Sequence, residues 1–432
     1  MEKQINVGML GFGTVGSGVA TIIKENEKQL SQKLGAVVKI KKIAVRDIEK
    51  NRGADINGSE LTTDINDVIQ DESIQVIVEV MGGVEEAHYA IEKALKASKA
   101  VITANKDLMA LHGHTLLKLA EEHQADLYYE ASVAGGIPII RTLEDGLASD
   151  RISTIMGIVN GTTNYILTKM KEEGWSYEDA LKEAQALGFA ESDPTSDVEG
   201  LDAARKMAIL ATLAFSMEVY LDDVEVTGMT NITAEDMALA EQFGYSVKML
   251  GFAEKDEDGV DVAVEPVFLK SSHPLAAVRN EYNAVYVYGD AVGETMFYGP
   301  GAGSMPTATS VVSDVIAACR NLLLGVAGAR HIDYVNDRQI KQEDQQHAQF
   351  FHRLLVKDKI GVFSALTDIY GKYEASLSSI IQRPGDTEGE AEVILITHPV
   401  SRKNHHKIIE ELNGSDVVKT IISQYRVEGG DR

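Results

Sequence analysis

The stretch INVGMLGFGTVGSGVATIIK, residues 5–24, decides the fold of the first third of the chain. Its apolar residues predict a strand over Ile5–Leu10 and a helix from Val15 to about Leu30. The junction has the pattern GxGxxG, whose glycines permit a tight turn, and a pyrophosphate can lie on the N-terminus of the helix that follows. The residues of this junction are Gly11, Phe12, Gly13, Thr14, Val15 and Gly16. The stretch therefore predicts the first unit of a dinucleotide-binding fold.

Strands and helices continue to alternate as far as residue 130. The expected strands are 38–45, 74–80, 100–103 and 127–130, and the expected helices are 85–97 and 111–123. Such alternation implies parallel strands joined by right-handed crossovers, and hence a doubly wound α/β sheet of Rossmann type. We assign residues 1–136 to an NAD(P)-binding Rossmann domain.

The pattern changes after Gly135-Gly136. Strands over 151–159 and 260–264 lie among helices, so residues 137–305 are expected to form a mixed α/β domain. A helix from about Thr307, within 306–332, is expected to return to the nucleotide-binding domain, and the polar residues 333–350 to form a linker. Residues 351–432 predict a ferredoxin-like βαββαβ unit. Its elements are expected at 352–356, 362–373, 375–382, 391–398, 404–412 and 417–427.

Composition excludes several classes of protein. A chain of 432 residues suggests about three domains, and a net charge of −25 argues against a nucleic-acid partner. The single cysteine, Cys319, excludes a disulfide framework and lies in an apolar stretch, where it is expected to be a small core residue and not a nucleophile. The first residues do not resemble a signal peptide, and no apolar run approaches the roughly 20 residues of a membrane span. We expect a cytoplasmic protein with no membrane partner.

The segment LGFAESDPTSDVEGLDAARKMAIL, residues 187–210, carries an acid and a base with helical spacing. Ser196 and Glu199 have the spacing of a capping box, which predicts a helix beginning near Asp197. Within that helix, Asp202 and Lys206 are four residues apart and share one face. A lysine beside carboxylates can bind an ammonium group and move a proton. The alternative is a solvated ion pair worth about 0.2–0.5 kcal/mol.

Two further regions are candidates for cofactor contacts. Arg46 at the end of the second strand can pair with a 2′-phosphate, whereas Asp47 would favour a free 2′-hydroxyl. We favour NADP over NAD, although both side chains could be ordinary loop charges. Lys106 follows the strand 100–103, where an open α/β sheet places ligand contacts. The loop Gly299–Gly303 could close over a cofactor or be a plain turn.

Five segments in order resemble the homoserine dehydrogenase family over residues 1 to about 330. The chain from about His352 resembles an ACT domain, a small regulatory fold attached to some members of that family. The five segments are GxGxVG from Gly11, TANKDL from Thr103, EASVAGGIPII from Glu130, GIVNGTTNYIL from Gly157 and LGFAESDPTSDVEGLDAARK from Leu187.

The resemblance implies a role for each matching position near the substrate. Lys206 would be the general acid/base, and Asp202 would orient the reacting group. Glu191 would hold the substrate ammonium, with the backbone of Gly188 nearby. Asp197 is a further substrate-binding candidate because of its position in the sequence, just upstream of Asp202, and not because of the resemblance. Lys106 would bridge cofactor and substrate. The dinucleotide would contact Gly13, Thr14 and Val15, and Gly303 would close over it.

The resemblance also implies a sodium ion beside the hinge between domains, bound mostly by backbone oxygens. The matching positions are Glu130, Val133, Gly135 and Ile137. In ACT domains an amino acid typically binds near the turn from first strand to first helix, at the interface of paired units. Here Asp358 could meet an ammonium group, and Gly361 would let the backbone approach a ligand.

The implied protein is an NAD(P)-dependent enzyme that interconverts L-homoserine and L-aspartate 4-semialdehyde. It would have a Rossmann-type domain, a mixed α/β catalytic and dimerisation domain over 137–305, and an ACT domain over 351–432. The implied assembly is a homodimer or homotetramer, with L-threonine as the first feedback effector to test. The alternatives are another Rossmann-fold amino-acid alcohol dehydrogenase and a non-catalytic amino-acid sensor.

Overall fold

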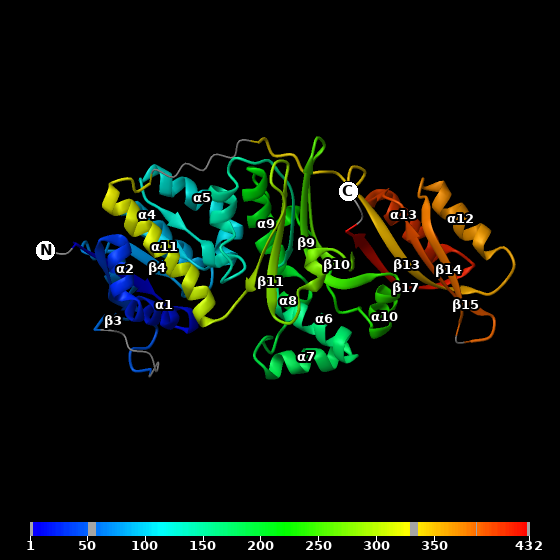
Figure 1. Ribbon diagram of the computed structural model, residues 1–432, viewed down its shortest axis with the longest axis horizontal. Coiled ribbons are helices and arrows are strands. Elements are labelled where there is room, and N and C mark those ends of the chain that lie inside the picture. Colours follow the sequence, from blue (N-terminus) through cyan, green and yellow to red (C-terminus); the bar gives the residue numbers. More distant parts are fainter. Residues whose placement is uncertain (1–2, 51–57, 329–335, 386, 430–432) are drawn as a thin grey trace. The chain divides into compact units, whose positions relative to one another are not determined.

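The computed structural model describes residues 3–50, 58–328, 336–385 and 387–429 (Figure 1). The chain divides into two units. Unit 1 comprises Met1–Ile155, Arg205–Asp223 and Tyr282–Arg338, and unit 2 comprises Met156–Ala204, Val224–Glu281 and Gln339–Arg432. The division falls within strand β7 (Ile152–Ile158) and helix α9 (Leu201–Phe215).

Unit 1 contains a six-stranded sheet in the order β3-β2-β1-β4-β5-β6, and every pair is parallel. This order confirms the expected doubly wound sheet of Rossmann type, in which ligands bind at the carboxyl ends of the strands where the order reverses. The strands are β1 (Lys3–Leu10), β2 (Ala36–Ala44), β3 (Glu60–Thr62), β4 (Val76–Glu79), β5 (Ala100–Thr103) and β6 (Leu127–Tyr128).

The helices of unit 1 are mostly those expected from the sequence. The predicted helix from Val15 to Leu30 is two helices that meet at Asn26, and β3 and α3 were not predicted. The helices are α1 (Thr14–Glu25), α2 (Glu27–Leu34), α3 (Ile65–Ile69), α4 (Glu85–Lys96), α5 (Lys106–Glu122) and α11 (Ser304–Leu324). The hairpin of β11 (Tyr282–Gly289) and β12 (Gly293–Pro300) also belongs to this unit.

Helix α11 packs on α1 and forms part of the core of unit 1. A Cβ on Gly18 would lie 2.9 Å from Ala308, so the two helices touch closely at this glycine. By length and composition alone α11 could cross a membrane, which corrects the expectation that no apolar run approaches that length. Half of its apolar window is buried, and Val311, Val315 and Cys319 are fully buried within the core. These contacts are those of a core helix.

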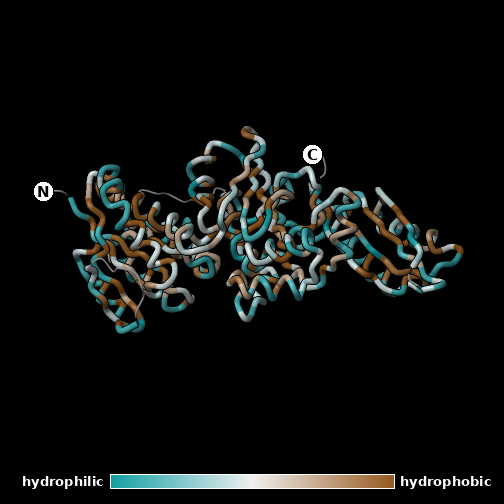
Figure 2. Tube along the Cα trace, turned by 60° about the horizontal axis from the view of Figure 1, so that its bottom comes forward, coloured by the Kyte–Doolittle hydropathy of each residue, from teal (hydrophilic) through white to brown (hydrophobic). Residues whose placement is uncertain are grey.

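The central part of unit 2 surrounds a long antiparallel hairpin, β9 with β10. Figure 2 shows hydrophobic segments alternating with hydrophilic ones along the chain. The elements are α6 (Gly161–Glu173), α7 (Tyr177–Ala186), α8 (Thr195–Val198), β8 (Glu225–Val226), α10 (Ala234–Gln242), β9 (Tyr245–Asp256) and β10 (Gly259–Lys270).

The C-terminal part of unit 2 has the predicted order βαββαβ. Its strands pair antiparallel in the order β17-β13-β15-β14, which is a ferredoxin-like sheet. Strand β17 also pairs in parallel with β10, where Val267 faces Arg426, so this sheet continues into the β9–β10 hairpin. Part of the predicted linker, 333–335, lies outside the described residues. The elements are β13 (His347–Lys357), α12 (Val362–Lys372), β14 (Leu377–Pro384), β15 (Glu390–Thr397), β16 (Val400–Ser401), α13 (Arg402–Gly414) and β17 (Val418–Glu428).

Candidate active site

The glycine-rich turn between β1 and α1 is shaped for close backbone approach. Gly11 has φ +97°, and a Cβ there would lie 2.6 Å from the backbone oxygen of Val80. A Cβ on Gly16 would lie 2.9 Å from the oxygen of Gly11, whereas the space beside Gly13 is open to 4 Å. The turn thus has room for a pyrophosphate at the N-terminus of α1, which begins at Thr14.

The second glycine-rich loop meets this turn within unit 1. Gly303, with φ +116°, precedes the first residue of α11. The hydroxyl of Ser304 donates to the backbone oxygen of Thr14 at 2.6 Å. Gly303 therefore lies beside the nucleotide turn.

The side chains after β2 are exposed. Arg46 and Asp47 both face solvent, and the carboxylate of Asp47 accepts from the backbone N–H of Glu49 at 2.9 Å. Asp47 thus stabilises a local turn. Residues 51–57, which follow, lie outside the described residues.

A buried network fixes the start of α5, and its central carboxyl was not predicted. Glu79, at the end of β4, accepts from the Thr103 hydroxyl at 2.6 Å and from the Met81 N–H at 2.8 Å. Burial raises the pKa of Glu79. Asn105 caps α5 through the N–H of Leu108 at 3.1 Å. The network holds the residue that begins α5, the half-buried Lys106.

An ion pair joins the first turn of α5 to α9. Asp107 follows Lys106, and its carboxylate lies 2.8 Å from the guanidinium of Arg205. Arg205 in turn precedes the half-buried Lys206. Lys106 and Lys206 are therefore each adjacent in sequence to one member of this ion pair.

The predicted single helix beginning near Asp197 is instead two helices, α8 and α9. Gly200 adopts φ +81° between them, a left-handed conformation that breaks the helix. The predicted Ser196–Glu199 capping box is wrong, because Ser196 lies inside α8 and Glu199 is the C-cap residue of that helix. At the start of α8, Asp193 accepts from the N–H of Thr195 at 3.1 Å. Asp202 and Lys206 remain four residues apart, both on α9.

Asn160 is a site residue that the sequence analysis missed. Its amide nitrogen donates to Asp202 at 2.8 Å and to Asp197 at 2.7 Å. Its oxygen accepts from the N–H of Thr163 at 2.9 Å and caps α6. Asp202 is only 3% exposed, so this bond fixes a buried carboxylate. The position of Asn160, between a strand and an apolar helix, was the available signal.

The loop that precedes α8 is tied to α6 and α7. The Thr162 hydroxyl donates to the backbone oxygen of Phe189 at 2.6 Å. The side-chain amide of Gln185 donates to the backbone oxygen of Glu191 at 3.0 Å. Gly188 adopts φ +78°, and the carboxylate of Glu191 is exposed. The backbone of this loop is thus fixed while the Glu191 side chain faces solvent.

The positions expected to hold sodium form a buried turn in unit 1. The two carboxylate oxygens of Glu130 accept from the N–H groups of Ile140 at 2.8 Å and Arg141 at 2.9 Å. The backbone oxygen of Gly135 accepts from the Ser310 hydroxyl at 2.7 Å. Within the described ranges no cluster of three His, Cys, Asp or Glu side chains could hold a metal. A cation here would therefore rely on backbone oxygens, including those of Val133 and Ile137.

The turn from β13 to α12 borders a hollow of about 260 Å³. Gly361 adopts φ +93°, and the Asp358 carboxylate accepts from Gln382 at 3.4 Å. Ile360 is fully exposed and Phe363 is 39% exposed. The turn is accessible, with a carboxylate and two apolar side chains.

A parallel Rossmann sheet with this glycine turn defines the class of protein as dinucleotide-binding. Comparison with protein families agrees. The model for the homoserine dehydrogenase NAD binding domain matches residues 11–130, and the homoserine dehydrogenase model matches residues 138–316.

Individual relatives match nearly the whole chain. The homoserine dehydrogenase of Bacillus subtilis is 53% identical, with 99% of each chain covered. The crystal structure of the Thiobacillus denitrificans enzyme has a TM-score of 0.93 at 36% identity, covering 99% of this chain and 98% of that one. A hyperthermophilic archaeal homoserine dehydrogenase in complex with NADPH has a TM-score of 0.61 at 28% identity, covering 73% of this chain and 97% of that one.

The chain belongs to the homoserine dehydrogenase family. It is an NAD(P)-dependent oxidoreductase that interconverts L-homoserine and L-aspartate 4-semialdehyde, a step in the synthesis of threonine, methionine and isoleucine.

Proposed function

We propose that Lys206 moves the proton of this reaction and that Asp202 orients the reacting group. The observation that carries the proposal is the Asn160 amide, which holds the buried Asp202 carboxylate at 2.8 Å, one helical turn before Lys206 on α9. Side chains at i and i+4 share a helix face, so the two act on the same side of α9.

The proton balance follows from these assignments. When bound, the nicotinamide accepts or supplies the hydride. In the oxidation of homoserine, the Lys206 amine takes the hydroxyl proton as the carbonyl forms. In the reverse direction its ammonium returns that proton to the aldehyde oxygen. Lys106 is proposed to contact cofactor and substrate from the start of α5.

We assign binding of the amino-acid part of the substrate to the loop before α8. The exposed Glu191 carboxylate is a counter-charge for the substrate ammonium, with the backbone of Gly188 and the carboxylate of Asp197 as further contacts. Support comes from the fixed backbone of this loop and from the exposure of the Glu191 side chain, whereas the Asp193 carboxylate is engaged by Thr195.

A double-mutant cycle tests the pairing of Asp202 with Lys206. Asp202→Asn, Lys206→Met and the double variant are compared in kcat for homoserine oxidation. Groups that act as a unit give strongly non-additive losses. We expect the double variant to lose little more than Lys206→Met alone. Losses that multiply would contradict the assignment.

The cofactor is proposed to be NADP. Arg46 is exposed at the end of β2, and Asp47 is engaged by the Glu49 N–H, so the guanidinium is better placed for a 2′-phosphate than the carboxylate is for a ribose hydroxyl. One archaeal relative was solved with NADPH.

We propose a sodium ion on the backbone oxygens of Glu130, Val133, Gly135 and Ile137. The turn is buried, and both carboxylate oxygens of Glu130 accept backbone N–H groups. The Glu130 side chain would therefore lie near the ion without being its main ligand. Replacing sodium by choline in the assay should lower activity. Equal activity in both salts would contradict the ion.

The C-terminal βαββαβ unit is proposed to be an ACT domain that binds L-threonine at the turn of Asp358 and Gly361. The family models end at residue 316, so this part lies outside both of them. The exposed side chains of Ile360 and Phe363 could pack against a second copy of the chain in a homodimer or homotetramer. We propose that the enzyme is cytoplasmic.

Threonine inhibition should be measured on the full chain. Truncation near Gln349 would remove β17 from β10 and so damage the sheet of unit 2. Asp358→Asn should weaken inhibition by threonine and leave basal turnover unchanged. If threonine has no effect on the wild-type enzyme, the regulatory assignment is wrong.

A further inference from the structure

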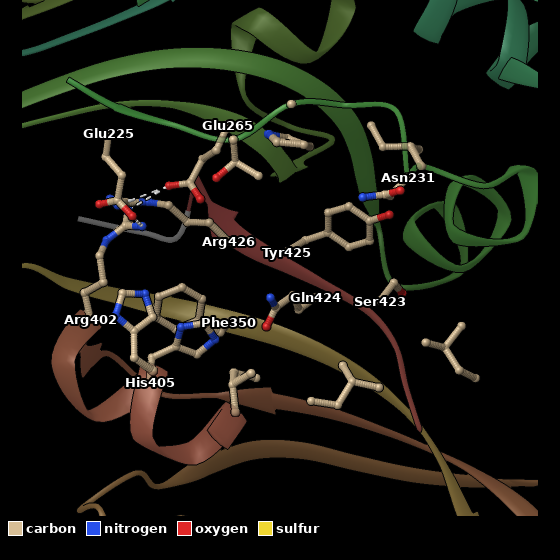
Figure 3. Close-up of a pocket in the computed structure, with 18 of the residues that line it drawn as sticks. Glu225, Asn231, Glu265, Phe350, Arg402, His405, Ser423, Gln424, Tyr425 and Arg426 are labelled. Atoms are coloured by element: carbon tan, nitrogen blue, oxygen red, sulfur yellow. Dashed lines mark hydrogen bonds and ion pairs between the residues drawn. The ribbon is translucent and has the colours of Figure 1, made fainter. Parts of the chain in front are cut away.

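A cavity of about 530 Å³ lies within unit 2, and its two walls come from different parts of the chain (Figure 3). Residues 225–232 and β10 form one wall, and β13, α13 and β17 form the other. Small-molecule pockets typically measure about 300–1,000 Å³. The parallel pairing of β17 with β10 joins the walls, so the cavity is preformed. Its lining contains none of the residues assigned above to catalysis, cofactor, cation or effector.

A buried arginine and two carboxylates place both signs of charge at one end of this cavity. The Arg402 guanidinium donates to Glu225 at 2.5 Å and to Glu265 at 3.0 Å. The side chain of Arg402 is 7% exposed, whereas that of Glu225 is 37% exposed. Figure 3 shows the three side chains converging above His405. Glu225 is therefore the accessible carboxylate of the cluster.

Carboxylates outnumber guanidinium groups around this end. A second buried arginine, Arg426, lies 3.9 Å from Glu265 and 3.8 Å from Asp261, and it also pairs with Glu428. Two guanidinium groups thus face four carboxylates, because Glu225 and Glu265 belong to the same cluster. Burial raises the pKa of Glu225. This balance disfavours a ligand whose charges are all negative, such as phosphate, and favours one that carries an ammonium group.

Apart from these charged groups and the rings of Phe350, His405, His406 and Tyr425, most of the lining is polar and uncharged or aliphatic. Hydroxyl and amide groups can bind a ligand's polar atoms, and the aliphatic side chains offer a place for a short apolar group. The polar members are Thr227, Asn231, Asn413, Ser423 and Gln424, and the aliphatic members are Ile232, Ile409, Ile421 and Ile422.

A buried chain of side chains fixes the histidine on the second wall. His405 stacks on Phe350 with ring centroids 3.6 Å apart. Its Nε2 lies 2.9 Å from Nε2 of the buried His352, whose Nδ1 lies 2.7 Å from the hydroxyl of Tyr370 on α12. Burial lowers the pKa of both histidines, so the ring of His405 is a neutral, oriented wall of the cavity.

We propose that this cavity binds a free α-amino acid with a short aliphatic side chain, its ammonium on Glu225 and its carboxylate toward Arg402. A zwitterion matches both members of the ion pair, and the isoleucines receive its side chain. The volume exceeds that of such a ligand, which leaves room for ordered water at the amide groups. The site is separate from the Asp358 turn and does not depend on the threonine assignment there.

Calorimetric titration of the full-length enzyme tests the proposal, with L-valine, L-isoleucine, L-threonine and L-methionine as probes. We expect at least one to bind, and its N-acetyl derivative and its methyl ester, each lacking one charge, to bind at least about tenfold more weakly. Glu225→Gln should weaken binding about tenfold or more and leave turnover unchanged. Glu235→Gln is the matched control. Glu235 pairs with Arg353 at a distance of 2.7 Å, and it does not line the cavity.

Asn413→Trp provides a second variant that fills the cavity without changing a charge, and it should also weaken binding. Either of two results overturns the proposal. One is that none of the four probes binds at millimolar concentration. The other is that binding survives both Glu225→Gln and Asn413→Trp. If Asp358→Asn alone then abolished binding, the ligand would lie at the turn instead.

Discussion

Replacing Asn160 by serine separates the two roles of that side chain, which are to bind the carboxylates and to cap α6. The amide nitrogen donates to Asp202 and Asp197, and the oxygen caps α6 through the N–H of Thr163. Serine is also a favoured N-cap residue, so Asn160→Ser should keep the cap. Its hydroxyl offers one shorter donor in place of two amide hydrogens, so the bonds to the carboxylates should be lost.

The lost bonds set the size of the effect. A hydrogen bond to a charged group contributes about 1.5–3 kcal/mol. Asp202 is 3% exposed, so its bond should lie within that range, whereas half-buried Asp197 can turn to water. We expect a loss of about 2–3 kcal/mol in unfolding free energy. For a unit of this size that lowers the unfolding midpoint by about 4–12 °C.

Trp175 is the single tryptophan of the chain and belongs to unit 2, so its fluorescence reports the unfolding of this unit. The assay is a thermal melt together with kcat for homoserine oxidation, which should fall because Asp202 is no longer fixed. Asn160→Ala is the control: it loses the cap as well and should cost about 1 kcal/mol more. A serine variant with wild-type midpoint and kcat would refute the reasoning.

Three further predictions concern binding and pH. Glu191→Gln should raise KM for homoserine about tenfold or more by removing the counter-charge of the ammonium, and a change confined to the cofactor KM would contradict the assignment. Arg46→Ala should raise KM for NADP more than KM for NAD, and equal changes would remove the support for NADP. Burial lowers the pKa of His352 to about 3. The folded state therefore binds fewer protons, and stability should fall as pH drops below about 6.5, by up to about 1.4 kcal/mol per pH unit per buried histidine. A double variant, His352→Gln with His405→Gln, should show a smaller decrease in melting temperature between pH 7 and 5, and an unchanged decrease would exclude these histidines as its cause.

The Rossmann domain was largely predictable because its signals are local. Most of its strands are short apolar runs, and the glycine turn has a fixed spacing, so a parallel, doubly wound sheet followed from general rules of connection. Breaks in helices were less predictable. Asn26 and Gly200 interrupt patterns whose apolar period continues across them, and only the backbone conformation shows where the helix ends.

Long-range pairing was beyond the sequence. Nothing local indicates that β17 pairs with β10, because either strand could have been a sheet edge. The partners of Asp202 were hidden for the same reason, since Asn160 lies 42 residues away along the chain. The Arg402 cluster likewise joins residues more than a hundred positions apart.

The central claim is that Lys206 carries the proton in homoserine oxidation. Its most direct test is the rate of NAD(P)H formation from L-homoserine by Lys206→Ala, with the melting curve of the same protein showing that the fold persists. General acid–base catalysis contributes about 10²–10⁴-fold, and the variant should lose turnover by that factor. Turnover within a few-fold of wild type would contradict the claim.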